Sequence, residues 1–190
     1  MNEDAQNRAN EKDMWVIRPE DEKDESFIEA LVAASFGPGR YAKSAYRLRE
    51  GVRAEPGLSF VAIEDGILRG SVRFWPVFVG ASPALLLGPL AVQNGQRGRG
   101  IGIALMNRGI EEAGTRGHRA IILVGDLPYY SRVGFGQLTR GSVRFPGPVD
   151  PARVLGLALE QGALADLSGP VRRARIDDAV VADAVAWGPA

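Results

Sequence analysis

Residues 84–92 form an apolar run, ALLLGPLAV, that leads directly into a glycine- and arginine-rich turn. The run is apolar along its whole length rather than alternating, which is typical of a strand covered on both faces of a sheet. After the turn, residues 93–102 (QNGQRGRGIG), a helix is predicted because Ile103, Met106 and Ile110 share one face. A buried central strand, a bare turn and an amphipathic helix in direct succession indicate a mixed α/β fold.

Segments on both sides of this unit alternate between strand and helix patterns. Alternating or continuous apolar runs predict strands, whereas apolar residues spaced three or four apart predict helices. Asp65-Gly66 suits the positive φ values of a tight hairpin turn. On these patterns we expect strands at residues 14–19, 58–64, 67–79, 120–124 and 153–159, and helices beginning near Phe27 and within residues 41–50 and 126–135.

The length of the chain, 190 residues, suits one compact domain and leaves little room for a second. Residues 1–13 are charged and without period, so we expect a disordered N-terminal tail there. The domain is expected to cover residues 14–170. Residues 171–190 are expected to form a C-terminal tail with one short helix at 177–187.

The chain contains no Cys and a single His, His118. A disulfide framework, a thiolate zinc site and a Cys nucleophile are therefore excluded, and so is a His-rich metal centre. No apolar run approaches the roughly 18 residues of a membrane span, and residues 1–13 lack the basic-then-apolar layout of a signal peptide. We therefore expect a soluble, cytoplasmic protein without a bound metal and without a membrane partner.

Charge is balanced overall but unevenly distributed. The 23 Lys and Arg residues equal the 23 Asp and Glu residues in number. Zero net charge argues against constitutive nucleic-acid binding, because phosphates demand a cationic face. Residues 1–25 hold nine acids and four bases, so residues 26–190 carry a basic excess, mostly as Arg. Nucleic acid is therefore not the expected partner.

Three glycines in the turn, Gly98, Gly100 and Gly102, leave its backbone bare where a helix begins. Unpaired N–H groups at a helix N-terminus favour anions, and Arg97 and Arg99 add positive charge there. The turn is therefore predicted to bind a pyrophosphate or a similar polyanion. It lacks the Gly-Lys-Ser/Thr of a P-loop and the spacing of G-x-G-x-x-G. An ordinary strand-to-helix connection and an RNA-contacting Arg-Gly patch are the alternatives.

The turn does fit the pattern R-x-x-G-x-G, as RGRGIG at residues 97–102, and a second motif, Y-x-x-x-G-F, stands as YSRVGF at residues 130–135. With these motifs and the order of elements over residues 14–145, the chain resembles the GNAT family of acetyl-CoA-dependent N-acetyltransferases. The stretches LLGPLAV, ILVGD and FPGPVDP make it most similar to the YhbS-like predicted acetyltransferases. The resemblance implies a single α/β (α+β) domain with a mixed, mostly antiparallel, splayed sheet flanked by helices.

The resemblance also implies acetyl-CoA as co-substrate and transfer of its acetyl group to a primary amine by direct attack in a ternary complex. A small-molecule amine is the expected acceptor, and no metal is implied. Pro89 donates no backbone hydrogen bond, so the strand must be bulged or at an edge there, where the family opens its sheet. The implied cofactor-binding residues are Leu90, Ala91 and Val92 along the pantetheine arm, and Arg97, Gly98, Arg99, Gly100, Ile101 and Gly102 around the pyrophosphate.

Tyr130 matches the general acid of the family, which protonates the departing CoA thiolate. A phenol of ordinary pKa, about 10, can do so at neutral pH. The motifs do not identify the general base that deprotonates the amine, since residues 84–92 carry no carboxylate. Asp126 is our candidate, with Glu64, Asp65 and a water relay as alternatives. A structural role is open for two of these residues, Tyr130 as a core aromatic and Asp126 as the N-cap of the following helix.

Two other functions stay open on sequence alone. Because its central strand lacks a carboxylate, the domain can be read as a sensor that holds an acyl-CoA without turnover. The basic excess of residues 26–190 gives thin support to a protein or an aminoacyl-tRNA as the acceptor. Residues 153–159 can either close the sheet or pair across a homodimer.

Overall fold

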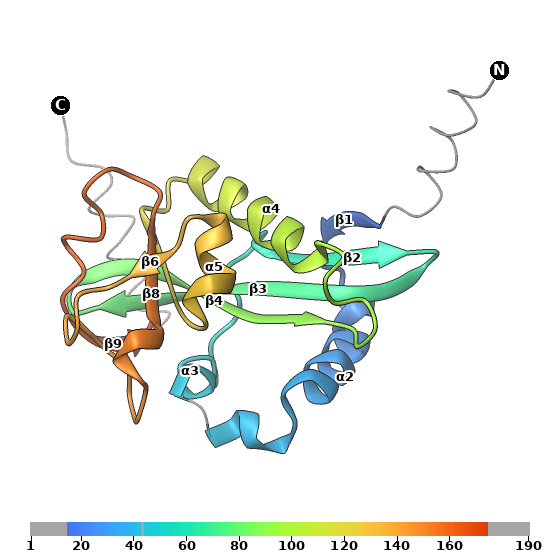
Figure 1. Ribbon diagram of the computed structural model, residues 1–190, viewed down its shortest axis with the longest axis horizontal. Helices are drawn as coiled ribbons and strands as arrows, with labels where there is room; N and C mark the ends of the chain where they lie inside the picture. Colours follow the sequence, from blue (N-terminus) through green and yellow to red (C-terminus); the bar gives the residue numbers. More distant parts are fainter. Residues whose placement is uncertain (1–14, 43, 175–190) are drawn as a thin grey trace.

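A computed structural model of the chain describes residues 15–42 and 44–174, which form one sheet with helices on both faces (Figure 1). The strands are β1 Val16–Pro19, β2 Ser59–Glu64, β3 Ile67–Val79, β4 Ser82–Val92, β5 Ala120–Val124, β6 Gly136–Gln137, β7 Val143–Arg144, β8 Val154–Ala158 and β9 Gly169–Arg173. The α-helices are α2 Glu25–Phe36, α3 Ser44–Arg47, α4 Ile101–Thr115 and α5 Leu127–Tyr130, and the 3-10 helices are η1 Glu22–Asp24, η2 Pro38–Ala42, η3 Ser131–Val133 and η4 Pro151–Arg153.

The strands of the sheet follow the order β1-β2-β3-β4-β5-β8-β6, and β9 lies beside both β3 and β7. Neighbouring strands are antiparallel, with β4–β5 and β7–β9 as the parallel pairs. This mixed, mostly antiparallel sheet flanked by helices confirms the fold class expected from the sequence. Strand β8 has β5 on one side and β6 on the other, so it closes the sheet within the chain.

Helix α4 covers one face of the sheet through the apolar stripe that its sequence predicts. Ile101, Leu105 and Met106 are buried in a cluster with residues of β2, β3, β4 and β5. The ring of Phe74 on β3 lies so close to Gly109 that a β-carbon there would overlap it. The helix ends at Arg116, its C-cap, and Gly117 follows with φ +80°. A glycine stop of this kind is typical of helix C-termini.

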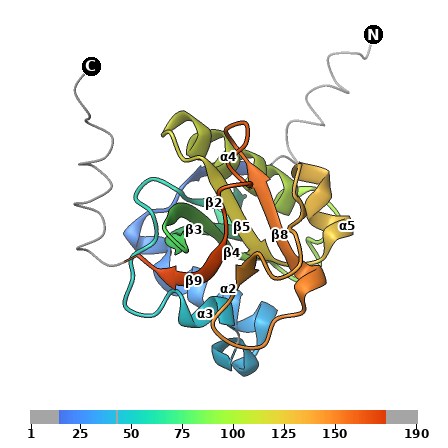
Figure 2. The same ribbon diagram turned by 90° about the vertical axis from the view of Figure 1, so that its left-hand side faces the viewer.

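Helices α2 and α3 lie on the opposite face (Figures 1 and 2). Ile28 and Val32 of α2 are buried against Val61 of β2 and Ala91 of β4. Leu48, directly after α3, is buried in a separate cluster with β3, β4, β5 and β9. The two helices therefore cover different halves of one face.

Strand β4 explains the unbroken apolar run of the sequence. Leu85 and Leu87 are buried in the cluster beneath α4, whereas Leu86 is buried on the other face with Ile122 of β5. Because successive side chains of a strand point to opposite faces, a strand covered on both sides must be apolar at every position. The central position predicted for this strand is confirmed.

The expected second helix is shorter than residues 41–50. It is limited to α3, Ser44–Arg47, after the 3-10 helix η2. Its backbone continues as a turn from Tyr46 to Arg49, and Gly51 adopts φ +71°. One helical turn satisfies few of its own backbone groups, so the packing of Leu48 rather than helix propensity decides how this segment runs.

The C-terminal boundary expected at residue 170 falls inside a strand. Strand β9, Gly169–Arg173, pairs with the end of β3, which extends beyond the last residue that β2 covers. Val79 lies opposite Val171, which is buried. A single buried residue in a Pro- and Arg-rich segment is too weak a pattern to predict a strand. The expected tail at 1–13 and the expected helix at 177–187 lie outside the described residues.

None of the helices in the described part of the chain is long and apolar enough to cross a membrane.

Candidate active site

The sheet opens where strand β4 leaves its neighbour β5. The two strands pair at Leu85 with Ile121 and at Leu86 with Ile122. Beyond Leu86, β4 keeps its pairing with β3 but has no strand partner on its β5 side within the described residues. The second half of β4 therefore presents a free edge of backbone groups, which another extended chain can pair with.

A bulge marks the start of this free edge. The pairing of β3 with β4 shifts register between Val72 and Phe74, opposite Gly88 and Pro89, and Gly88 has φ +120°. The indole N–H of Trp75 donates a hydrogen bond of 2.6 Å to the carbonyl of Gly88, which fixes the bulged backbone. Of the two alternatives that Pro89 predicts, a bulge or an edge position, the bulge is present in the pairing with β3, because a residue without N–H cannot continue a regular ladder.

The opening in the sheet forms a cavity of about 780 Å³. This volume lies in the range typical of small-molecule and cofactor sites. Its walls come from the free edge of β4, the turn before α4, α5 and the two helices α2 and α3. Of the residues predicted for the site, those that line the cavity are Leu90, Ala91, Val92, Arg97, Gly98, Gly100, Ile101, Gly102, Asp126 and Tyr130.

The turn before α4 presents bare backbone to the cavity. Gly98 has φ +84°, and Gly100, the N-cap of α4, has φ +91°, a backbone conformation that favours glycine. No side chain caps the helix at Gly100. The N–H groups of its first turn and the positive end of the helix dipole therefore favour an anion at this place.

The two arginines of the turn point in different directions. Arg97 lines the cavity, whereas Arg99 pairs with Glu64 at 2.7 Å and also hydrogen-bonds Gln96. Arg99 is thus the predicted site residue whose side chain the structure does not bring to the cavity. Its hydrogen bond, together with a second ion pair from Arg69 at 3.1 Å, holds the pKa of Glu64 below its usual value.

Glu64 and Asp65, two of the alternatives for the base, lie away from the cavity. Neither belongs to its lining. Glu64 is committed to its two arginines, and Asp65 occupies the hairpin turn between β2 and β3 with φ +50°. Two neighbouring cations stabilise the charged form of a carboxylate and make it a weaker base, which argues against Glu64 as the base.

Helix α5 carries two tyrosines into the cavity. Burial raises the pKa of Tyr130 to about 12 and also raises the pKa of Tyr129. The ring of Tyr130 stacks edge-on against Phe135 and lies close against Gly125. The hydroxyl of Tyr129 lies against Gly102, where a β-carbon would overlap it. Both phenols are protonated at neutral pH and are therefore hydrogen-bond donors.

Asp126 occupies the N-cap position of α5, but its carboxylate makes no capping hydrogen bond. The interpretation of this side chain as a cap is therefore wrong. Pro128 lacks the N–H that an N-cap side chain often accepts, and the N–H of Tyr129 bonds the Asp126 carbonyl instead. The carboxylate is largely exposed and lies 3.2 Å from Nη2 of Arg153, which also lines the cavity.

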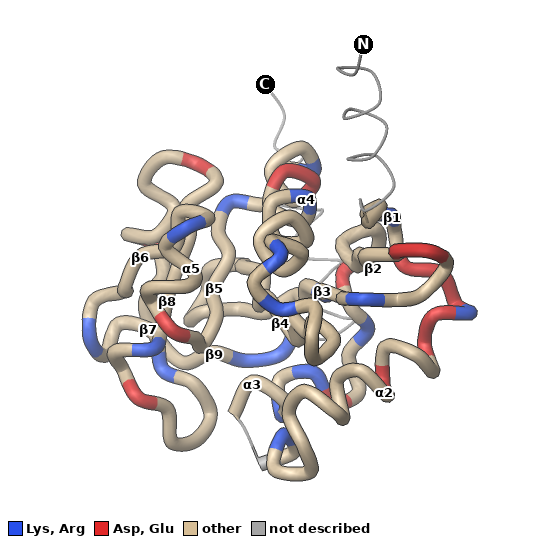
Figure 3. Tube along the Cα trace, turned by 45° about the vertical axis from the view of Figure 1, so that its right-hand side comes forward, with Lys and Arg blue, Asp and Glu red and all other residues tan. Residues whose placement is uncertain are grey.

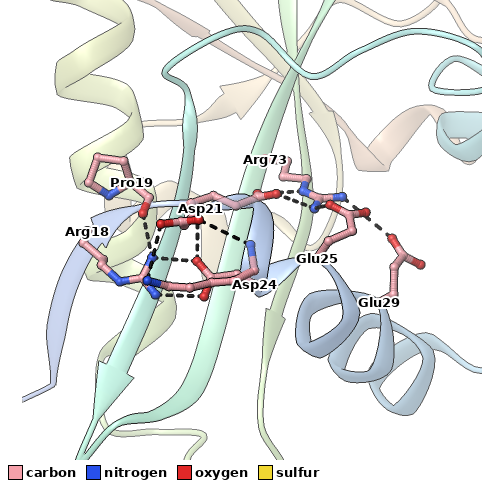
Figure 4. Close-up of polar contacts among 9 residues, drawn as sticks. Arg18, Pro19, Asp21, Asp24, Glu25, Glu29 and Arg73 are labelled. Atoms are coloured by element: carbon pink, nitrogen blue, oxygen red, sulfur yellow. Dashed lines mark hydrogen bonds and ion pairs between the residues drawn. The ribbon is translucent and has the colours of Figure 1, made fainter.

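A charge cluster around the buried Arg73 supports the opposite wall. Arg73, on β3 opposite the bulge, bonds Glu20 at 2.5 and 2.8 Å and Glu25 at 2.6 Å, and it lies 3.7 Å from Glu29 (Figure 4). Burial opposes the charge of this guanidinium, but the bonds from Glu20 and Glu25 outweigh burial and raise the pKa of Arg73. The cluster ties α2 to the sheet beside the cavity, and Glu29 contributes to the lining.

Comparisons with known proteins decide the family. Residues 12–135 match the acetyltransferase (GNAT) family. The chain belongs to this family. It is 34% identical over 148 residues to the uncharacterized N-acetyltransferase YhbS of Escherichia coli K12, covering 75% of this chain and 87% of that protein. It is 33% identical over 132 residues to the uncharacterized N-acetyltransferase YjhQ of the same strain, covering 67% and 72%.

Solved GNAT structures share the fold. The crystal structure of YhbS from Escherichia coli in complex with CoA matches with a TM-score of 0.73 and 30% identity, covering 85% of this chain and 91% of that one. A GNAT acetyltransferase from Brucella melitensis in complex with acetyl-CoA matches with a TM-score of 0.57 and 30% identity, covering 78% and 97%. The resemblance inferred from the motifs is thus confirmed.

Several residues that line the cavity of this GNAT chain are not among the site residues predicted from the sequence. They are Glu29 on α2, Tyr46 and Arg49 at α3, Trp75 beside the bulge and Tyr129 on α5. The dipeptide Tyr129-Tyr130 is a signal that could have pointed to the second phenol. The other residues lie far from the motifs in sequence, and only the packing of α2 and α3 over the end of β4 brings them to the site.

Proposed function

We propose that the protein is an acetyl-CoA-dependent N-acetyltransferase that transfers the acetyl group to a primary amine by direct attack in a ternary complex. One observation carries the proposal: the free edge of β4 and the bare turn before α4 open into the same cavity. An extended amide-containing arm suits the first, and a pyrophosphate suits the second. The two relatives of solved structure that bind CoA or acetyl-CoA support this assignment.

The chain's own groups fit such a co-substrate, which would supply the acetyl group as an activated thioester. The stretch from Leu90 to Val92 offers backbone hydrogen bonds to the pantetheine arm from alternate residues, and a strand N–H polarises the thioester carbonyl. The amides of residues 97–102 hold the pyrophosphate. The positive φ of Gly98 and Gly100 lets these amides converge, and Arg97 adds a positive charge.

Tyr130 serves as the general acid in this proposal. Its phenol keeps its proton at neutral pH and donates it to the sulfur as the carbon–sulfur bond breaks and the carbon–nitrogen bond forms. Because the chain contains no Cys, acetyl transfer through a cysteine thioester is excluded, which favours a ternary complex. Rate enhancement then comes from holding the amine in line with the carbonyl and from N–H stabilisation of the oxyanion.

The amine must lose its ammonium proton before it attacks. Asp126 lines the same cavity as Tyr130, lies 3.2 Å from Arg153 and is our candidate base. Asp126→Asn is expected to reduce turnover below about pH 8 and to matter less at higher pH, where more of the amine is already neutral. An unchanged pH–rate profile would remove Asp126 from the mechanism and favour a water relay.

Calorimetric titration with acetyl-CoA and with dephospho-CoA tests the cofactor site. We expect micromolar binding of acetyl-CoA and its loss in Gly100→Asp, which places a negative charge in the turn. Gly95→Asp is the matched control, because Gly95 has φ +86° in the same loop but does not line the cavity. Absence of binding at millimolar acetyl-CoA in the unaltered protein would overturn the assignment.

A sensor that binds acyl-CoA without turnover is the second candidate, favoured by the absence of a carboxylate on β4. Tyr130→Phe separates the two functions. Binding of acetyl-CoA should persist in this variant under both, whereas turnover should fall about 100-fold or more if Tyr130 is an acid. Release of free CoA thiol in the presence of an amine panel measures turnover, and its absence in the unaltered protein would favour the sensor.

A further inference from the structure

Arg49 places an unpaired cation against the cavity. Its Nε is buried without a hydrogen-bond partner, and no carboxylate of the described residues pairs with its guanidinium. Part of the side chain stays accessible through the cavity, which it lines. Burial lowers the pKa of Arg49 to about 10, so the group is still charged at neutral pH. A cation that is withdrawn from water without a counter-ion destabilises the fold, unless a bound anion compensates its charge.

Two other arginines of the cavity differ from Arg49 in this respect. Arg73 is bonded by glutamates on the α2 side, and Arg153 pairs with Asp126. Glu50, next in the chain to Arg49, is exposed and forms no ion pair with it. Basic residues gather around α3, as Figure 3 shows. An anion that balances Arg49 would therefore come from outside the described residues.

The position of Arg49 separates it from the pyrophosphate turn. Its Nη2 lies 2.9 Å from the place that a β-carbon on Gly88 would occupy, so the guanidinium rests against the bulge of β4. From Gly88 to Val92 the strand advances about 13 Å, at about 3.3 Å per residue, before it reaches the turn. Arg49 thus lies at the opposite end of the free edge from the anion site at residues 97–102.

The surroundings of Arg49 are those of the acetyl-transfer end. Tyr130 and Tyr46 lie near enough to influence the pKa of its guanidinium, and Trp75 fixes the carbonyl of Gly88 beside it. Leu48 anchors the segment in the core, so the neighbouring Arg49 is held in place. An anion bound here lies next to the proposed general acid, where the acceptor must bring its amine.

We propose that Arg49 binds a carboxylate of the acceptor, so that the substrate class is an amino acid or another small amine with a carboxylate close to its amino group. This inference rests on the proposed function. A planar guanidinium matches the two oxygens of a carboxylate in a bidentate pair. One arginine balances the single charge of a carboxylate, whereas a phosphate would call for further donors.

The test compares amines that differ only in the carboxylate. The twenty amino acids and their α-carboxamides are supplied with acetyl-CoA, and release of free CoA thiol gives kcat and KM. We expect kcat/KM of at least one amino acid to exceed that of its amide about tenfold or more. A ratio of this size corresponds to one hydrogen-bonded pair of charged groups. Arg49→Gln should raise KM for that amino acid about tenfold and abolish the preference, and Arg49→Lys should restore part of it.

Arg47→Gln is the matched control, because Arg47, the last residue of α3, lies two positions before Arg49 but is exposed and does not line the cavity. It should leave KM unchanged. Acetyl-CoA affinity, measured by calorimetry, should change less than about twofold in Arg49→Gln if the residue binds the acceptor rather than the cofactor. Equal turnover of acids and amides, or a preference that survives Arg49→Gln, overturns the inference while the proposed function stands.

Failure of the proposed function has a different signature. The unaltered protein would then fail to bind acetyl-CoA or fail to acetylate any amine. In that case the same amino acids are titrated into the protein by calorimetry. Binding that is lost in Arg49→Gln but kept in Arg47→Gln supports the carboxylate site, and absence of binding at millimolar amino acid overturns it.

Discussion

Arg99 forms an ion pair with Glu64, with 2.7 Å between Nη2 and Oε1, and its guanidinium therefore does not line the cavity that Arg97 lines. Two arginines separated by one glycine thus have different roles. The first adds charge to the proposed pyrophosphate site, whereas the second fastens the turn to the hairpin of β2 and β3.

We expect Arg97→Gln to weaken acetyl-CoA binding about five- to tenfold, because a charge-assisted contact to phosphate is lost. Arg99→Gln keeps the backbone amide and should change the affinity less than about twofold, while it lowers the midpoint of thermal unfolding. Calorimetry and thermal denaturation measure the two effects. The reverse order of affinities would show that Arg99 reorients toward the cofactor.

Gly102 and Tyr129 provide a second test. A β-carbon at Gly102 would overlap the Tyr129 hydroxyl, so Gly102→Ala should displace the tyrosine and weaken acetyl-CoA binding. Removing the hydroxyl relieves this overlap, and the double variant Gly102→Ala, Tyr129→Phe should recover most of the affinity of Tyr129→Phe alone. Additive losses in the double variant would contradict this contact.

Arg73 and Arg49 should differ in their effect on stability. Arg73→Met leaves Glu20 without its partner and should lower the free energy of unfolding by about 3 kcal/mol. Arg49→Met removes a cation that has no carboxylate partner among the described residues, so it should leave the free energy of unfolding unchanged or raise it. Denaturant titration of both variants measures the free energy of unfolding. A large decrease in Arg49→Met would indicate a structural role for this guanidinium.

Glu64 should contribute to acid sensitivity. The hydrogen bond from Arg99 lowers the pKa of Glu64 in the folded state, so the unfolded chain binds a proton at this group at a higher pH than the folded chain does. Its stabilisation is therefore present above the ordinary pKa, about 4.3, and is lost as the pH falls through the lower folded value. The loss of stability between pH 7 and pH 3 should be smaller in Glu64→Gln, and identical profiles would show that the pair contributes nothing.

Sequence by itself determined the order of the main elements and the backbone of the proposed cofactor site. The apolar run at 84–92, the glycines after it and the stripe on α4 are local patterns. Each encodes its structure through backbone conformation or face periodicity, so strand, turn and helix could be predicted without knowing what they pack against. Pro89 predicted a bulge or an edge position for the same reason, because a missing N–H acts wherever the strand lies.

Tertiary structure alone decided the acceptor side and the roles of individual charges. Arg49, Glu29 and Trp75 come from three separate segments, and their meeting at the end of β4 depends on how α2 and α3 pack across the sheet. Whether Arg97 or Arg99 reaches the cavity depends on Glu64, more than 30 positions earlier in the chain. Such long-range pairings leave no periodic trace in a single sequence, since they are set by burial and charge between elements rather than within one.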